Sequence, residues 1–241
     1  MFNNLNLFNK KKKDQKRTAY EIVTMTRPQS FIAEEYRTLR TNIQFSMVGK
    51  KLKTIQFTSS GPNEGKTTTA INTAVLFASQ GKKVLLVDAD MRKPSLHSIF
   101  QVPNQKGLST ILTSERPNPA AVIYPLEHKQ LFLMTSGIQP PNPSELLASN
   151  QMNMLMQYFK EHYDLVIFDL PPILPVTDAQ VMASKVDGTV FVIRHNSVHL
   201  NEVLQAKEML QRVQANVIGA VFNDKPRNKK ISGTYYTESE K

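Results

Sequence analysis

Cysteine and tryptophan are both absent from this chain of 241 residues. Without cysteine, neither a disulfide framework nor a thiolate metal site can form. Long apolar runs are lacking as well: Asp169 and three prolines interrupt the longest, residues 165–176, whereas a membrane helix needs roughly 18–20 apolar residues. At the N-terminus, lysines follow the first apolar residues, which is the reverse of a signal peptide. We therefore expect a cytoplasmic protein with neither a membrane span nor a leader.

Acidic residues are outnumbered, and the formal net charge is +10. The excess lies at the two ends: residues 1–17 hold six basic residues against one aspartate, and residues 225–230 hold four more. Such blocks either bind anionic partners, such as nucleic acid or the inner membrane leaflet, or remain solvated tails. Because the sequence has no nucleic-acid recognition motif, we expect no nucleic-acid partner.

Short apolar segments alternate with helical patterns through the middle of the chain. This alternation predicts an α/β fold, a mostly parallel sheet with helices on both faces. Ser30 is the expected N-cap of the first helix, and the proline-rich residues 91–130 are expected to form an insertion over one sheet edge. The expected strands are 54–58, 84–87, 131–134, 165–168, 189–193 and 217–222, and the expected helices are 30–45, 65–79, 143–162, 177–185 and 197–213.

A phosphate-binding loop follows the first expected strand. The residues are Ser60, Gly61, Pro62, Asn63, Glu64, Gly65, Lys66, Thr67 and Thr68. Lying between a strand and a helix, such a loop surrounds phosphates with backbone N–H groups at a helix N-terminus. Its lysine supplies a positive charge and its first threonine can ligate Mg²⁺. The strict pattern begins with glycine, and Ser60 departs from it.

Aspartates end two other expected strands. Asp88 and Asp90 follow the apolar residues 84–87, and Asp169 follows residues 165–168. Carboxylates at the ends of buried strands are costly unless something compensates them, and a metal ion with a triphosphate does so. The five histidines lack metal-ligand spacing, and no nucleophile elbow is present. The sequence therefore predicts a site for ATP and Mg²⁺ at the carboxyl ends of the strands.

These motifs resemble those of the bacterial tyrosine kinases (BY-kinases) of capsule and exopolysaccharide export, in the cytoplasmic form of Gram-positive bacteria. The resemblance covers residues 30–223 and implies a P-loop NTPase of the deviant Walker, partition-ATPase-like type. Residues 60–67, 85–92 and 166–171 are similar to Walker A, Walker A′ and Walker B. Residues 219–223 are similar to the strand end at which Asn223 meets adenine.

The resemblance implies a role for each site residue. Lys66 neutralises the transferring phosphoryl group, and Thr67, Asp90 and Asp169 hold Mg²⁺. Asp88 accepts the proton of the incoming tyrosine, although the division of roles between Asp88 and Asp90 stays open.

Two further segments carry the resemblance. Glu34, Arg37 and Arg40 lie three residues apart, on one helical face, and are similar to the motif through which BY-kinases assemble into rings; pairing within the helix is the alternative. Tyr235 and Tyr236 are the expected phosphoacceptors, fewer than in the usual tyrosine cluster. We accordingly divide the chain into a basic flexible arm (1–29), a kinase domain (30–223, with 30–46 as oligomerisation helix) and a flexible acceptor tail (224–241).

The implied partners are other copies of the chain, a separate transmembrane adaptor that brings it to the inner face of the cell membrane, and a cognate tyrosine phosphatase. Two other functions remain open. One is an ATPase switch of the partition or division-site type, which normally carries a further lysine where this chain has Gly61. The other is a nucleotide-gated scaffold of polysaccharide assembly, in which phosphorylation is incidental.

Overall fold

The computed structural model describes residues 22–49 and 52–224. In this part of the chain one seven-stranded sheet has the order β3-β4-β2-β5-β1-β6-β7. Neighbouring strands run parallel except β3, which is antiparallel to β4. The strands are β1 Thr54–Ser59, β2 Val84–Asp88, β3 Ile123–Pro125, β4 Leu131–Met134, β5 Leu165–Asp169, β6 Gly188–Arg194 and β7 Val217–Asn223. The predicted α/β class with a mostly parallel sheet is confirmed.

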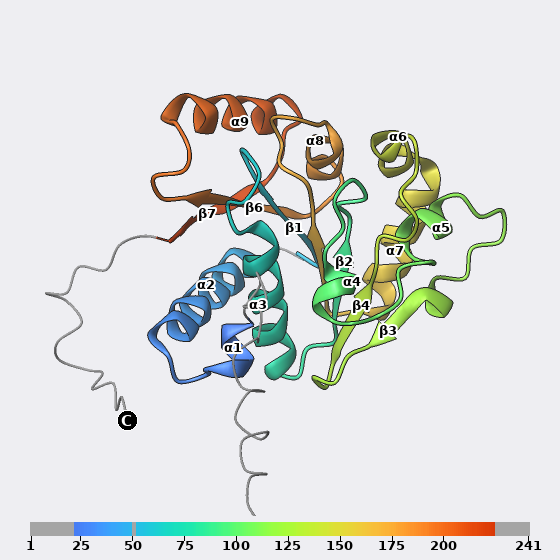
Figure 1. Ribbon diagram of the computed structural model, residues 1–241, viewed down its shortest axis with the longest axis horizontal. Helices are drawn as coiled ribbons and strands as arrows, with labels where there is room; N and C mark the ends of the chain where they lie inside the picture. The colour runs from blue at the N-terminus through green and yellow to red at the C-terminus, as the bar shows by residue number, and fades with distance from the viewer. Residues whose placement is uncertain (1–21, 50–51, 225–241) are drawn as a thin grey trace, which may run out of the picture.

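Helices cover both faces of this sheet (Figure 1). Helices α2, α3 and α4 pack on one face, and α5 to α9 pack on the other. The helices are α1 Val23–Thr26, α2 Phe31–Met47, α3 Lys66–Ser79, α4 Leu96–Ile99, α5 Leu108–Leu112, α6 Pro143–Ala148, α7 Asn150–His162, α8 Asp178–Ala183 and α9 Leu200–Arg212, with a 3₁₀ turn at Pro119–Val122.

The alternation of side chains along each strand explains the two layers. In β2, Val84 and Leu86 belong to the core under α3, whereas Leu85 and Val87 belong to the core under α7. Successive side chains of a strand point to opposite faces. A strand with helices on both sides is therefore apolar at every position, as the sequence of β2 is.

Two sequence expectations are corrected at the level of elements. Residues 143–162 form two helices instead of one, because Ser149 takes an extended backbone conformation and its side chain caps α7 by accepting from Met152 N. The segment 91–130 lies at the sheet edge but holds α4, α5 and strand β3. The N-cap at Ser30 is confirmed, since its hydroxyl accepts from Ala33 N.

The N-terminal boundary also differs from the expectation. Thr24, in α1, is buried, and both its N–H and its hydroxyl donate to the side-chain oxygen of Asn72 in α3. Residues 22–29 thus belong to the folded unit, and for them the expected flexible arm is wrong. Residues 1–21 and 225–241 lie outside the described residues.

Within residues 22–49 and 52–224, no helix is long and apolar enough to cross a membrane.

Candidate active site

The phosphate-binding loop joins β1 to α3, as predicted. Gly65 directly precedes α3 in the left-handed conformation, with φ of 91°. A Cβ added there would lie 2.1 Å from the side-chain nitrogen of Asn223. Glycine adopts this backbone conformation without strain, and any larger residue would displace the Asn223 side chain. The sharp turn leaves the N-terminal N–H groups of α3 at the loop, where a helix favours an anion.

The predicted cationic and acidic residues converge at the start of α3. Lys66 Nζ lies 3.2 Å from Asp90 Oδ2 and 3.7 Å from Asp169 Oδ1. Thr67 Oγ1 donates to Asp169 Oδ2 at 2.7 Å. Asp88 is in register with Asp169, because β2 and β5 are paired directly. Strand register therefore explains how residues from three motifs far apart in the sequence meet.

Burial sets the charge state of this cluster. It raises the pKa of Asp88 to about 8, helped by the negative charge of Asp169, although the N–H groups of Leu96 and Ser95 oppose the rise. Burial also raises the pKa of Asp169. For Lys66 burial alone would lower the pKa, but Asp169 and Asp90 raise it above its ordinary value. The site therefore holds more negative charge than one lysine compensates comfortably.

Two carboxylate oxygens of the cluster are buried without a donor, and the one on Asp169 suits a divalent cation. Asp88 Oδ1 and Asp169 Oδ1 have no hydrogen-bond partner, and an unsatisfied buried carboxylate oxygen is costly. The described residues form no ready-made cluster of three acidic or histidine metal ligands. Mg²⁺ in phosphoryl-transfer sites uses one or two carboxylates together with substrate phosphates and water. The donor set of Thr67, Asp90 and Asp169 fits that incomplete kind of site.

Asn223, at the end of β7, lies against the phosphate loop. Its Nδ2 donates to the backbone oxygen of Glu64 at 2.9 Å. The hydrogen bond directs the amide nitrogen of Asn223 to the protein, so the amide oxygen is the atom available to the nucleobase. An oxygen acceptor suits the exocyclic amino group of adenine.

The oligomerisation motif lies away from this cluster, on α2. Arg37 forms an ion pair with Glu34 in the same helix, which is the intrahelical pairing that the sequence left open. Arg37 also donates to Pro28 O, outside the helix. Arg40 is not part of that pair, and its buried Nε has no partner. Tyr235 and Tyr236 lie outside the described residues.

Sequence reasoning missed two arginine contacts around the site. Arg92 forms two 2.9 Å hydrogen bonds to Asp178, whose side chain is fully buried. Arg194, at the end of β6, donates to Asn63 O at 3.3 Å and pairs with Asp224. The position of Arg92 as the last residue of the 85–92 motif was the one available signal, because its partner is 86 residues away.

Comparisons with known proteins show which proteins this chain is similar to. A protein-family profile described as an AAA domain matches residues 52–221. Tyrosine-protein kinase YwqD of Bacillus subtilis is 45% identical over 89% of this chain and 90% of its own length. Putative tyrosine-protein kinase CapB of Staphylococcus aureus is 38% identical over 92% of this chain and 97% of its own.

A solved structure supports the same assignment. The kinase domain of the Escherichia coli tyrosine kinase ETK superposes with a TM-score of 0.82 at 32% identity, covering 91% of this chain and 85% of that domain. Identity at this level over nearly the whole length, together with the lysine and three aspartates gathered at one P-loop, leads to one conclusion: this chain belongs to the family of bacterial tyrosine-protein kinases.

Proposed function

We propose that this chain is an ATP- and Mg²⁺-dependent protein-tyrosine kinase of capsule and exopolysaccharide biosynthesis that phosphorylates Tyr235 and Tyr236 of a neighbouring copy. The observation that carries the proposal is the position of Lys66 between Asp90 and Asp169, with an unpartnered oxygen on Asp88. Phosphoryl transfer depends mainly on positioning and charge stabilisation, and this cluster supplies both.

The side chains divide the chemistry among them. Lys66 and the loop N–H groups stabilise charge on the transferring phosphoryl group. Thr67, Asp90 and Asp169 would hold Mg²⁺, which when bound neutralises charge on the phosphates. The tyrosine oxygen forms a bond to the γ-phosphorus while the bond to the β,γ-bridging oxygen breaks, and ADP leaves. The phenolic proton passes to Asp88.

Asp88 is the better candidate for the base than Asp90. Both oxygens of Asp90 are engaged, Oδ2 with Lys66 Nζ and Oδ1 with Lys93 N. In Asp88 only Oδ2 is engaged, by Ser95 N and Leu96 N, so Oδ1 remains to accept a proton. This difference supports assigning the base to Asp88.

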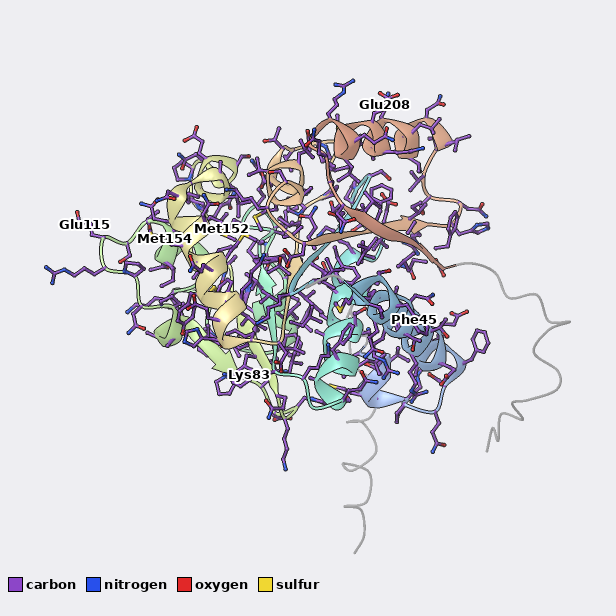
Figure 2. All side chains as sticks on the ribbon, turned by 180° about the vertical axis from the view of Figure 1, so that it is seen from behind. Phe45, Lys83, Glu115, Met152, Met154 and Glu208 are labelled. Atoms are coloured by element: carbon purple, nitrogen blue, oxygen red, sulfur yellow. The ribbon has the colours of Figure 1, made fainter. Side chains whose placement is uncertain are left out.

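Assembly through α2 would bring one chain's tail to another chain's site. Phe45 projects from the end of α2, as Figure 2 shows, and it is 71% exposed beside Val48 at 75%. Exposed apolar side chains at the end of the helix that carries Glu34, Arg37 and Arg40 suit an interface between copies. A transmembrane adaptor would hold the assembly at the inner face of the membrane, with a tyrosine phosphatase reversing the reaction.

The ATPase switch is less well supported. Its further lysine is replaced by Gly61, whose N–H is bonded to Glu64.

The scaffold alternative predicts that phosphorylation is dispensable for polysaccharide output. Replacement of both acceptor tyrosines by phenylalanine in cells distinguishes the scaffold from the kinase, because polysaccharide output is lost only if phosphorylation is the signal.

A phosphotyrosine assay tests the kinase directly. The full chain is incubated with Mg-ATP, with and without the cytoplasmic peptide of an adaptor, beside Lys66→Met and a Tyr235→Phe/Tyr236→Phe double variant. We expect phosphotyrosine in the wild type and none in either variant. ATP hydrolysis without phosphotyrosine, even with the peptide, would contradict the kinase and favour the switch.

A further inference from the structure

Glu64 is a carboxylate buried inside the phosphate-binding loop. Its side chain is 1% exposed. One oxygen, Oε1, accepts from Ser60 Oγ at 2.7 Å and from Gly61 N. The other, Oε2, accepts from Arg194 N at 3.2 Å. Both oxygens are therefore occupied by donors of the protein, from the loop itself and from the end of β6.

The backbone of Glu64 is fixed as tightly as its side chain. The neighbours Asn63 and Gly65 have φ of 62° and 91°, so the chain turns in the left-handed region on both sides of Glu64. The carbonyl of Glu64 accepts from Asn223, and that of Asn63 accepts from Arg194. The ends of β6 and β7, which lie beside the start of α3 (Figure 1), hold this part of the loop in place.

A buried negative charge is unexpected in a loop that binds polyphosphate. It opposes an incoming anion electrostatically and is costly to bury unless several donors satisfy it. Three donors do so here, and strong hydrogen bonds to a carboxylate also restrain the groups that donate them. The same contact explains the departure from the strict P-loop pattern, because the residue in place of the first glycine supplies one of the donors.

We propose that Ser60 and Glu64 form a positioning pair that holds the phosphate-binding loop in its nucleotide-binding shape and fixes it to the end of β6. Neither side chain touches the phosphates. Their effect passes through the backbone: the pair sets where the N–H groups at the start of α3 point before nucleotide arrives, which lowers the ordering cost of binding. This inference rests on the proposed nucleotide site and deepens it.

The positioning role predicts a specific pattern of kinetic changes. Glu64→Ala should raise the dissociation constant of a fluorescent ADP analogue with Mg²⁺, and the KM for ATP, by about tenfold or more, since hydrogen bonds to charged groups are worth at least that factor. The kcat should stay within about threefold, because the cluster of Lys66 and the aspartates is untouched. Glu64→Gln should be intermediate, because its amide oxygen still accepts from Ser60 and Gly61 but its nitrogen cannot accept from Arg194.

The full chain is used throughout, with Glu161→Ala as the matched control on the exposed side of α7. Ser60→Gly should weaken binding less than Glu64→Ala, and the double variant should bind like Glu64→Ala alone, because two residues that act as a unit are not additive. Circular dichroism checks the fold of each variant, and Glu64→Gln and Ser60→Gly carry the test if Glu64→Ala does not fold.

Three results would overturn the inference: unchanged nucleotide affinity in Glu64→Ala and Glu64→Gln, simple additivity of the Ser60 and Glu64 effects, or a fall in kcat at unchanged affinity. Direct binding separates this inference from the proposed kinase activity. A wild type that binds nucleotide but forms no phosphotyrosine contradicts the kinase alone, whereas a wild type that binds no nucleotide overturns both.

Discussion

Asp88 is held by two backbone N–H groups on one oxygen while its other oxygen is buried without a partner. Burial raises its pKa to about 8, which means that the fold disfavours the charged form. A side chain that lowers stability but serves as the base of a reaction is typical of a trade between stability and activity. As the proposed base, Asp88 should increase activity while it lowers the stability of the fold.

Asp88→Asn separates those effects. Its amide oxygen can accept from Ser95 and Leu96 as before, but it cannot take a proton from tyrosine. We expect kcat to fall by about 10²–10⁴, the usual contribution of a general base, nucleotide affinity to stay within a few-fold, and the melting temperature of the nucleotide-free protein to rise. Single-turnover phosphorylation and thermal unfolding measure these quantities. Wild-type turnover in Asp88→Asn, judged beside Asp164→Asn as an exposed control, would contradict the assignment.

Gly107 shows a different constraint at the scale of one residue. A Cβ there would lie 2.2 Å from Thr135 O and 2.5 Å from Gly137 N, both backbone atoms that cannot move aside cheaply. Gly107→Ala should lower the free energy of unfolding by about 2 kcal/mol or more through overpacking. Gly219→Ala is the control, because no atom lies within 4 Å of its added Cβ. Urea unfolding that ranks the two variants equally would contradict this packing argument.

Much of the site was predictable because its residues stand at the ends of strands. The phosphate loop is continuous in sequence, and Asp88 and Asp169 each follow an apolar run, so their meeting follows from a parallel sheet. The contact between Arg92 and Asp178 was not predictable, because neither the residues around Arg92 nor those around Asp178 indicate a partner 86 residues away. The hydrogen bonds of Glu64 were missed for a similar reason, since the local sequence pattern does not show which donors a buried carboxylate accepts from.

At the scale of elements, local signals failed where one backbone conformation decides the outcome. The apolar spacing of residues 143–162 continues through Ser149, so periodicity alone predicts one helix. The structure ends α6 there because Ser149 is extended, with ψ of 161°, and its hydroxyl caps the next helix. Tertiary contacts also override composition at α1, where Thr24 is bonded to the buried Asn72.

The cap of α7 gives a test of this explanation. Ser149→Ala removes the acceptor for Met152 N and should lower the free energy of unfolding by about 1 kcal/mol. Ser46→Ala is a suitable control, since Ser46 lies near the exposed end of α2 and donates only to a carbonyl of its own helix. Chemical unfolding of both variants measures the difference. Equal stabilities would show that packing, and not the cap, separates α6 from α7.

Asp187, directly before β6, joins the start of β1 to the last turn of α7. Its Oδ2 accepts from Lys53 N, Thr54 N and Thr54 Oγ1, and its Oδ1 pairs with Lys160 Nζ of α7 at 2.7 Å. Burial acts to raise the pKa of Asp187, but the contacts with Lys160, Lys53 and Thr54 outweigh it and lower the pKa below its ordinary value. These contacts therefore favour the ionised form in the folded protein.

A depressed folded-state pKa gives stability that is present above the unfolded-state pKa, about 4, and is lost as pH falls through the lower folded-state value. Asp187→Asn should therefore cost about 2 kcal/mol at neutral pH, and its difference from the wild type should shrink below about pH 4. Unfolding curves across the range from neutral to acid measure the difference. A difference that grows on acidification would have the wrong sign for this account.

At the scale of the whole molecule, the active site and α2 are separate surfaces that α3 connects. Helix α3 begins at Lys66 in the site, and α2 packs beside it on the same sheet face (Figure 1). The exposed Phe45 and Val48 and the ion pair of Glu34 with Arg37 lie on α2. In the assembly that we propose, contacts made by α2 bring a tail to another chain's cluster, so assembly and phosphorylation should fail together.

A mixing experiment tests that dependence. The donor carries Tyr235→Phe and Tyr236→Phe but keeps Lys66, and the acceptor carries Lys66→Met but keeps both tyrosines. Neither alone should form phosphotyrosine on its tail, whereas the mixture should label the acceptor at a rate that rises with concentration, because transfer then occurs only between copies.

Alanine at Glu34, Arg37 and Arg40 in both chains should lower that rate at least about tenfold, as loss of an interface charge network does, while nucleotide affinity stays unchanged because the P-loop is not altered. Light scattering reports assembly in the same samples. Undiminished labelling by triple-alanine chains that remain monomeric would separate phosphorylation from the α2 surface, and labelling of the Lys66→Met chain without donor would contradict transfer between copies altogether.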